Sequence, residues 1–128
     1  MQTNFKPDNY NSACPYLVVD DAAKAIAFMV EVFQAQELRR FADETGRIAH
    51  AEVRLDDSIV MLGEGSTDWP AFEAYVHVYV PDVDSTYHRA LKAGAVSIQE
   101  PIKRDDADKR AAVKLGSGTC WWIATKVE

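Results

Sequence analysis

The chain has 128 residues, 48% of them hydrophobic, with 14 lysines and arginines against 20 aspartates and glutamates. This length suits one domain, residues 1–128, and the formal charge of -6 excludes a nucleic-acid-binding surface, which needs a basic field to neutralise phosphates. No apolar run approaches the roughly 20 residues of a membrane span, and the polar start resembles no signal peptide, so we expect no membrane partner and a cytoplasmic location.

The first half of the chain predicts a strand, a helix and three further strands. Residues 14–19 (CPYLVV) form a short apolar, β-branched run that is typical of a strand. A helix to Phe33 follows, because Asp20 or Asp21 can cap it and apolar residues then recur with helical spacing. Residues 38–42, 48–55 and 58–62, separated by turns at 43–46 and 56–57, predict three antiparallel strands.

The second half repeats this order after a connecting segment. Residues 63–73 (GEGSTDWPAFE) hold two glycines and a proline and lack any periodicity. Residues 75–80 predict a strand, residues 83–94 predict a helix that Gly94 ends, and residues 96–99, 111–115 and 119–125 predict three more strands. The charged run at residues 103–110 (KRDDADKR) has no apolar face, so we expect a solvated loop there.

A shift of sixty-one positions superposes the two halves without a gap up to the middle of the helix. It places Cys14 on Tyr75 and Met61 on Trp122. One strand, one helix and three strands cannot bury their own sheet, so two such units must pack together. The predicted fold class is therefore α+β, with two tandem βαβββ modules: module 1 at about residues 13–62, a linker at about 63–73 and module 2 at about 74–126.

Four segments resemble the vicinal oxygen chelate superfamily, and most closely its small PhnB-like, glyoxalase-related members. They are PYLVVDDAAKAIAF (residues 15–28), GRIAHAEVRLDDSIVML (46–62), YVPDVDSTYHRALKAGA (79–95) and WWIAT (121–125). The superfamily includes glyoxalase I, extradiol dioxygenases, fosfomycin-resistance enzymes and bleomycin-resistance proteins. The resemblance implies a cupped mixed sheet with the helices outside, commonly completed by a homodimer.

The resemblance also locates the four positions at which family enzymes hold a divalent metal with His, Gln or Glu. Here they carry Cys14, Met61, Tyr75 and Trp122. Tryptophan offers only an N–H donor and methionine only a thioether, so this is a poor divalent site, and we expect neither a metal nor another cofactor. A soft ion such as Cu(I) on Cys14 and Met61 is an alternative, although such isolated donors are more often buried apolar side chains.

Alternation along the strands predicts what the cup displays. Val76, Val78 and Val80 share the side of their strand that must face the helix, so the opposite side turns two phenols and an imidazole into the cup. The linker adds a tryptophan as a candidate lid or dimer contact. The residues predicted to bind a ligand are Cys14, Tyr16, Met61, Trp69, Tyr75, His77, Tyr79 and Trp122. Such an aromatic cup suits a flat apolar or heteroaromatic molecule, although the same rings also suit a closed core or a dimer seam.

Polar residues alternate along the third strand of the first half. His50, Glu52 and Arg54 share one face, and they form either a proton-transfer set, with His50 as base and Glu52 orienting it, or a hydrated ladder. His77, flanked by two tyrosines, is the better-placed base if chemistry occurs. The sequence has no nucleophile motif and no phosphate loop, so no residue is assigned a catalytic role.

Three hypotheses of function follow. The first is a metal-independent protein, not an enzyme, which sequesters or carries a hydrophobic or planar aromatic compound such as an antibiotic and forms a homodimer, as the resemblance to bleomycin-resistance proteins implies. The second is a glyoxalase-like lyase, isomerase or dioxygenase whose divalent metal is bound elsewhere, through His50, Glu52 and His77. The third is an interaction module whose cup is closed by its partner.

Overall fold

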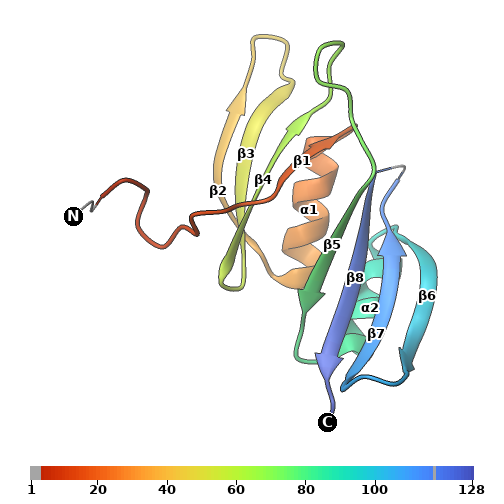
Figure 1. Cartoon of the computed structure of the whole chain (residues 1–128). Helices are drawn as coiled ribbons and strands as arrows, with labels where there is room; N and C mark the ends of the chain where they lie inside the picture. The colour runs from red at the N-terminus through yellow and green to blue at the C-terminus, as the bar shows by residue number, and fades with distance from the viewer. Residues whose placement is uncertain (1–3, 117) are drawn as a thin grey trace.

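The computed structural model describes residues 4–116 and 118–128. Its elements in chain order are β1 (Tyr16–Val19), α1 (Ala22–Phe33), β2 (Gln36–Ala42), β3 (Ile48–Leu55), β4 (Ser58–Glu64), β5 (Ala74–Tyr79), α2 (Val83–Lys92), β6 (Val96–Lys103), β7 (Asp108–Lys114) and β8 (Thr119–Lys126). The strands form two four-stranded sheets, sheet 1 in the order β1-β4-β3-β2 and sheet 2 in the order β5-β8-β7-β6 (Figure 1). The predicted α+β class with two tandem βαβββ units is confirmed.

The two sheets repeat each other in topology and register. In each sheet the first strand of the unit runs parallel to the last, and the other neighbours are antiparallel. Tyr16 pairs with Met61 in sheet 1, and His77 pairs with Trp122 in sheet 2, which is the same ladder position sixty-one residues later. The repeat found in the sequence is therefore a repeat of backbone pairing.

The two helices begin as the sequence predicts. Asp21 caps α1 by accepting a hydrogen bond from the backbone N–H of Lys24, and Asp82 caps α2 in the same way. The second helix ends just before Gly94, whose φ of 105° is one that glycine adopts without strain. Neither α1 nor α2, the two helices of the described residues, has the length and hydropathy of a membrane-spanning segment.

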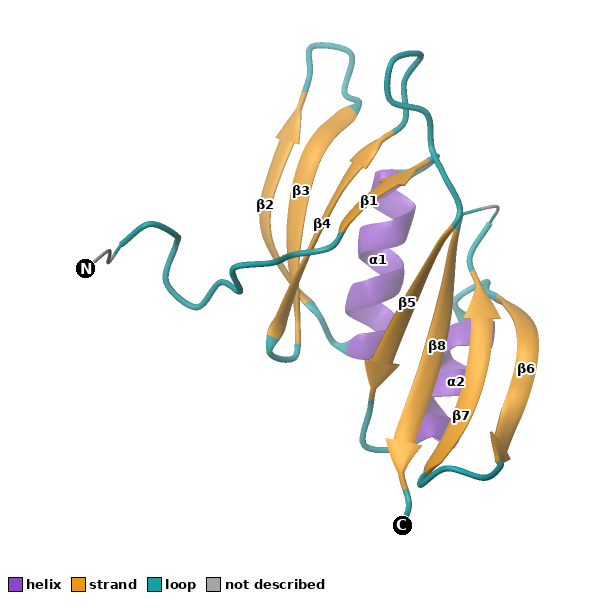
Figure 2. Cartoon of the chain, in the orientation of Figure 1, coloured by secondary structure: helices purple, strands orange, loops and turns teal. Residues whose placement is uncertain are grey.

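The core joins the two units through α1, which is buried on more than one side. Part of α1 packs on sheet 1, while Phe28 and Phe33 contact Trp121 of sheet 2, with ring centroids 6.1 and 5.2 Å apart. The guanidinium of Arg89 on α2 donates to the backbone carbonyl of Val32 near the end of α1 at 2.9 Å. In the view of Figure 2 both helices lie behind the strands, so each sheet has one covered face and one face turned away from the helices, which we call its open face.

The charged run at residues 103–110 is only partly the solvated loop that its composition predicts. β6 continues to Lys103, and β7 begins at Asp108, whose exposed fraction is only 8%. The prediction was wrong for Lys103, which belongs to β6, and for residues 108–110, where Asp108 and Arg110 pair with each other at 2.8 Å instead of requiring water. Paired charges tolerate burial that isolated ones do not.

Candidate functional site

The residues predicted to bind a ligand divide between the two sheets. Sheet 1 and the residues leading into it hold Cys14, Tyr16 and Met61; sheet 2 holds Tyr75, His77, Tyr79 and Trp122; and Trp69 lies in the connection between them. Tyr75 and Trp69 are 70% and 75% exposed. Among the described residues, no strand of one sheet pairs with a strand of the other, so a single chain presents two separate open faces.

The open face of sheet 1 carries a hydrogen-bonded cluster around Glu52 of β3. Glu52 Oε2 lies 2.8 Å from His50 Nε2, and Glu52 Oε1 lies 3.1 Å from Arg39 Nε on the neighbouring β2. His50 Nδ1 lies 3.2 Å from the hydroxyl of Tyr16. Because a carboxylate only accepts hydrogen bonds, Nε2 of His50 is the donor to Glu52. The pairing of His50 with Glu52 is therefore present and reaches one predicted binding residue.

A polar leader, residues 4–15, crosses this open face and adds Tyr10 to the cluster (Figure 1). Tyr10 donates its hydroxyl hydrogen to Glu52 Oε1, and the Arg39 guanidinium lies 5.7 Å from the centre of the Tyr10 ring. Arg54, the third polar residue of the predicted ladder, donates instead to the carbonyl of Asn9 at 3.0 Å. Glu52 is consequently only 5% exposed, although it lies on an open face.

Sheet 2 carries a second cluster, around Asp108. This carboxylate accepts from the hydroxyl of Tyr79 at 2.7 Å and from Arg110 Nη2 at 2.8 Å. Arg110 Nη1 also donates to Asp106, and Arg110 Nε donates to His77 Nε2 at 3.1 Å. A ring nitrogen that accepts from a guanidinium carries no proton, so His77 is neutral in this arrangement.

These contacts shift the acidities of four groups. Burial raises the pKa of Glu52, but the hydrogen bonds from His50 and Tyr10 and the charge of Arg39 outweigh it and hold this pKa below its usual range. Hydrogen bonding to Glu52 raises the pKa of Tyr10, and hydrogen bonding to Asp108 raises that of Tyr79. Burial, followed by the charge of Arg110, lowers the pKa of His77. Both phenols therefore remain protonated donors at neutral pH.

The four positions that correspond to a family metal site do not fit a divalent ion. Cys14 and Met61 lie at sheet 1, whereas Tyr75 and Trp122 lie on sheet 2. The indole of Trp122 can only donate a hydrogen bond, and the thioether of Met61 is a weak ligand for hard or borderline ions. Within the described part of the chain, no three His, Cys, Asp or Glu side chains are grouped so as to hold a metal.

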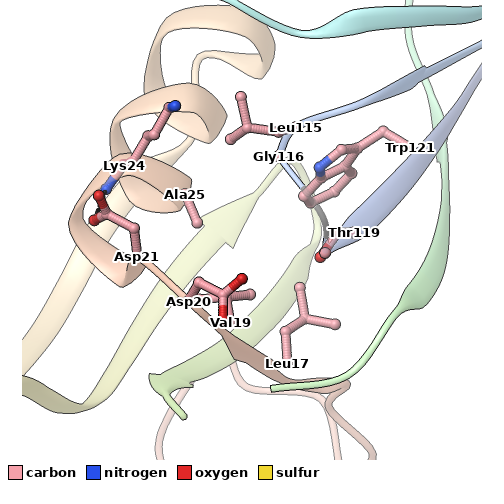
Figure 3. Close-up of a pocket in the computed structure, with 11 residues that line it drawn as sticks. Leu17, Val19, Asp20, Asp21, Lys24, Ala25, Leu115, Gly116, Thr119 and Trp121 are labelled. Atoms are coloured by element: carbon pink, nitrogen blue, oxygen red, sulfur yellow. Dashed lines mark hydrogen bonds between the residues drawn. The ribbon is translucent and has the colours of Figure 1, made fainter.

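Cavities lie beside both predicted and unpredicted residues. A cavity of about 270 Å³ opens between the start of α1 and the end of β7, where Val19 and Trp121 line it (Figure 3), and none of the eight predicted residues contributes to it. A cavity of about 350 Å³ contacts Trp122 on the open face of sheet 2. A third, of about 460 Å³, is lined by His77 and Tyr79 near the start of β4.

Five residues of the two clusters escape the sequence-based prediction: Tyr10, Arg39, Asp106, Asp108 and Arg110. Tyr10 belongs to a leader without periodicity, and it reaches a carboxylate forty-two residues away. Asp108 and Arg110 belong to a run whose composition is that of a loop. Only the two-residue alternation of Asp106, Asp108 and Arg110 was available as a signal that they share one strand face.

A model of the Glyoxalase/Bleomycin resistance protein/Dioxygenase superfamily matches residues 10–121. The uncharacterised protein Mb0911c of Mycobacterium bovis is 38% identical over 124 residues, which cover 88% of this chain and 82% of that protein.

Solved structures share the fold. TioX from Micromonospora sp. ML1 superposes with a TM-score of 0.70 at 23% identity, covering 90% of this chain and 95% of TioX. TnmS3, an antibiotic binding protein from Streptomyces sp. CB03234, superposes with a TM-score of 0.68 at 18% identity, covering 98% of this chain and 99% of TnmS3.

Proposed function

This chain belongs to the Glyoxalase/Bleomycin resistance protein/Dioxygenase superfamily, and we propose that within it the protein binds a hydrophobic or planar aromatic compound, such as an antibiotic, without a metal. The observation that carries the proposal is the chemistry of the open faces. Exposed rings of Tyr16, Tyr75 and Tyr79 lie there, together with the half-buried Trp122. Large aromatic surfaces with a few fixed polar groups suit flat ligands, which stack on the rings.

The donor set supports binding without a metal. Neither Trp122 nor Met61 offers the oxygen or imidazole ligand that a divalent ion needs at these positions. The polar groups nearby are already paired, since Glu52 accepts from His50 and Arg39, and Asp108 accepts from Arg110. The antibiotic-binding relative TnmS3, which has the same fold, is compatible with this function.

We propose further that the binding unit is a homodimer, in which a second copy covers the open faces. Tyr75, Tyr79, Phe41 and Ile98 expose between 53% and 70% of their area to solvent in the single chain. Burying these exposed apolar side chains against a second copy would be favourable. If the open face of sheet 1 in one subunit lies opposite the open face of sheet 2 in the other, a ligand between them is enclosed by aromatic side chains from both subunits.

Titration of the intrinsic tryptophan fluorescence with 9-aminoacridine, anthraquinone-2-sulfonate and bleomycin tests the binding. We expect saturable quenching by at least one planar compound, and its loss in Trp122→Phe but not in Trp121→Phe, whose ring lies in the core. Flat traces for every compound would overturn the proposal.

Light scattering coupled to size-exclusion chromatography tests the homodimer. A strictly monomeric protein at micromolar concentration would contradict it.

The alternative is a metal-dependent, glyoxalase-like enzyme, and the 2.8 Å contact between His50 and Glu52 is the observation in its favour. A metal on these residues would have to displace the hydrogen bonds that Glu52 receives from Tyr10 and Arg39. Elemental analysis of protein purified without chelator separates the two functions. Stoichiometric Mn, Fe, Ni or Zn that is lost in His50→Gln would favour the enzyme.

A further inference from the structure

We propose that Glu52 anchors a subsite for a phenolic hydroxyl, and that the chain itself fills this subsite with Tyr10. The inference rests on the proposed function and narrows it, because it names the ligand class: planar aromatic compounds that carry a hydroxyl on the ring. Tyr10 is then an internal stand-in for the ligand, and the contacts that it makes show how a phenol is recognised.

Glu52 is arranged to accept from a phenol. It is 5% exposed, and it is held in place by His50 on Oε2 and Arg39 on Oε1. A fixed, charged acceptor needs no reorganisation to bind a donor, and its hydrogen bonds are stronger than those of neutral groups. The third donor, the phenol of Tyr10, is the one member of the cluster that comes from outside the sheet.

The surroundings of Glu52 suit the rest of an aromatic ligand. Arg39 lies 5.7 Å from the centre of the Tyr10 ring, which is a distance at which a guanidinium attracts a π-face. Next to it, Tyr16 and Phe41 flank the His50 ring with centroids at 5.5 and 6.1 Å, and both remain about half exposed. A ligand larger than tyrosine therefore finds additional stacking surface beside the subsite.

Tyr10 can leave the subsite without detaching the leader. Asn9 accepts from Arg54 through its carbonyl, and Asn11 Oδ1 accepts from the backbone N–H of Ile59 at 3.1 Å. These two contacts hold the backbone on either side of Tyr10 and do not involve its side chain. Rotation of one partly exposed side chain therefore opens the subsite, which is a small change for a ligand to induce.

The experiment uses two probes that differ at one group, 2-naphthol and 2-methoxynaphthalene, whose affinities are measured by equilibrium dialysis against the full chain. Tyr10→Phe keeps the ring and removes the hydroxyl that competes for Glu52. We expect this variant to bind 2-naphthol about tenfold more tightly, corresponding to one hydrogen bond to a charged acceptor. Its affinity for 2-methoxynaphthalene should change less than twofold, because that probe has no hydrogen to donate.

Two further variants complete the test. Tyr87→Phe removes a phenol hydroxyl from the helix side, where Tyr87 donates to Ser97, and it should leave both affinities unchanged. Glu52→Gln should remove most of the preference for 2-naphthol, because the amide is a weaker, neutral acceptor. Equal binding of the two probes by the native chain, with no gain for 2-naphthol in Tyr10→Phe, would overturn the subsite while leaving aromatic binding intact. Absence of binding of both probes to every variant also overturns the subsite, and the proposed function is overturned with it only if the fluorescence titrations are flat as well.

Discussion

The open faces of the two sheets place different chemistry on the same ladder positions. Tyr16 contacts His50 in sheet 1, and His77 contacts Arg110 in sheet 2, at 3.2 and 3.1 Å. The two contacts are equivalent, because Tyr16 and His77 are sixty-one residues apart. On the partner strands, His50 directly precedes Ala51 and Arg110 directly precedes Ala111. These alanines pair with Leu62 and Ile123, which are again sixty-one residues apart. The repeated backbone therefore preserves a contact between neighbouring strands, while the side chains that make it have changed.

Each face also has a buried carboxylate that accepts from a phenol and an arginine, but the phenol has a different origin. In sheet 2 the phenol of Tyr79 belongs to β5, so the strand pairing fixes it. In sheet 1 the phenol of Tyr10 belongs to the leader, which no strand pairing fixes. The difference indicates that the Asp108 cluster stabilises its sheet, whereas the Glu52 cluster has a member that can exchange.

The covered faces should differ most in their contribution to stability. Trp121 is 2% exposed and contacts two phenylalanines of α1, whereas Val60, sixty-one residues earlier, is a small buried residue of sheet 1. We expect Trp121→Ala to lower the free energy of unfolding by about 3–5 kcal/mol and Val60→Ala by about 2 kcal/mol. Urea denaturation measures both, and equal losses would mean that Trp121 does not join the two units.

The next largest difference in the free energy of unfolding is expected between substitutions of the two carboxylates, Glu52 and Asp108. Glu52→Gln should cost about 2 kcal/mol, because it weakens the hydrogen bonds from Tyr10 and His50 and leaves Arg39 without its partner. Asp108→Asn should cost about 1 kcal/mol, because Arg110 keeps its contact with Asp106.

The loss in Glu52→Gln should depend on pH. The folded pKa of Glu52 is lowered, so its contribution is complete above the ordinary pKa of a glutamate and disappears as the pH falls through the folded value. Native and Glu52→Gln proteins should therefore converge in stability in acid. A difference that persists there would show that packing, not charge, is responsible.

A smaller difference in stability is expected near the end of the last strand of each unit, where Gly63 in β4 corresponds to Ala124 in β8. A Cβ on Gly63 would meet the carbonyl oxygen of Ala49 at 2.5 Å and the hydroxyl of Tyr16 at 3.1 Å. Gly63→Ala should cost about 1.5 kcal/mol through this crowding, and Ala124→Gly should cost about 1 kcal/mol through backbone freedom. Thermal denaturation checks the pair; a stabilising Gly63→Ala would show that the backbone relaxes freely.

The smallest expected effect concerns the protonation of His77. Its lowered pKa means that the folded state resists protonation, so stability from this group is complete above the ordinary histidine pKa and falls as the pH drops below it. Arg110→Gln should raise the pKa of His77 only partly, because burial is the larger cause. Titration of the imidazole proton resonances by NMR measures the shift, and no change in the variant would remove Arg110 from the explanation.

The sequence predicts the elements well because their signals are local. Alternation along β5 separates Val78, which is buried, from Tyr75 and Tyr79, which are exposed. Aspartate caps and Gly94 mark the helix ends. The repeat predicts that Met61 and Trp122 occupy equivalent ladder positions because the same backbone pairing underlies both.

The sequence does not predict which residues form the two clusters, because their membership depends on contacts between segments that are distant along the chain. Nothing local to Tyr10 indicates that its hydroxyl meets Glu52, and nothing in the charged run indicates that Asp108 is covered by Tyr79. The shift of sixty-one residues also fails between β3 and β7, because the strand pairing relates these two strands by sixty residues. A shift of sixty-one would therefore match Glu52 with Val113, on the covered face, instead of Ala112. One residue of difference between the strand connections is enough to exchange the two faces.

The position of α1 between the units has a consequence for synthesis of the chain on the ribosome. Phe28 and Phe33 emerge early, but Trp121, whose ring they contact, is made 93 and 88 residues later. Until then the nascent first half exposes an aromatic surface, which is a substrate for chaperones and a site for mispairing between neighbouring nascent chains. Ribosomes stalled within the second half should therefore yield a product that aggregates, because the last strand completes the core of the first unit as well as its own.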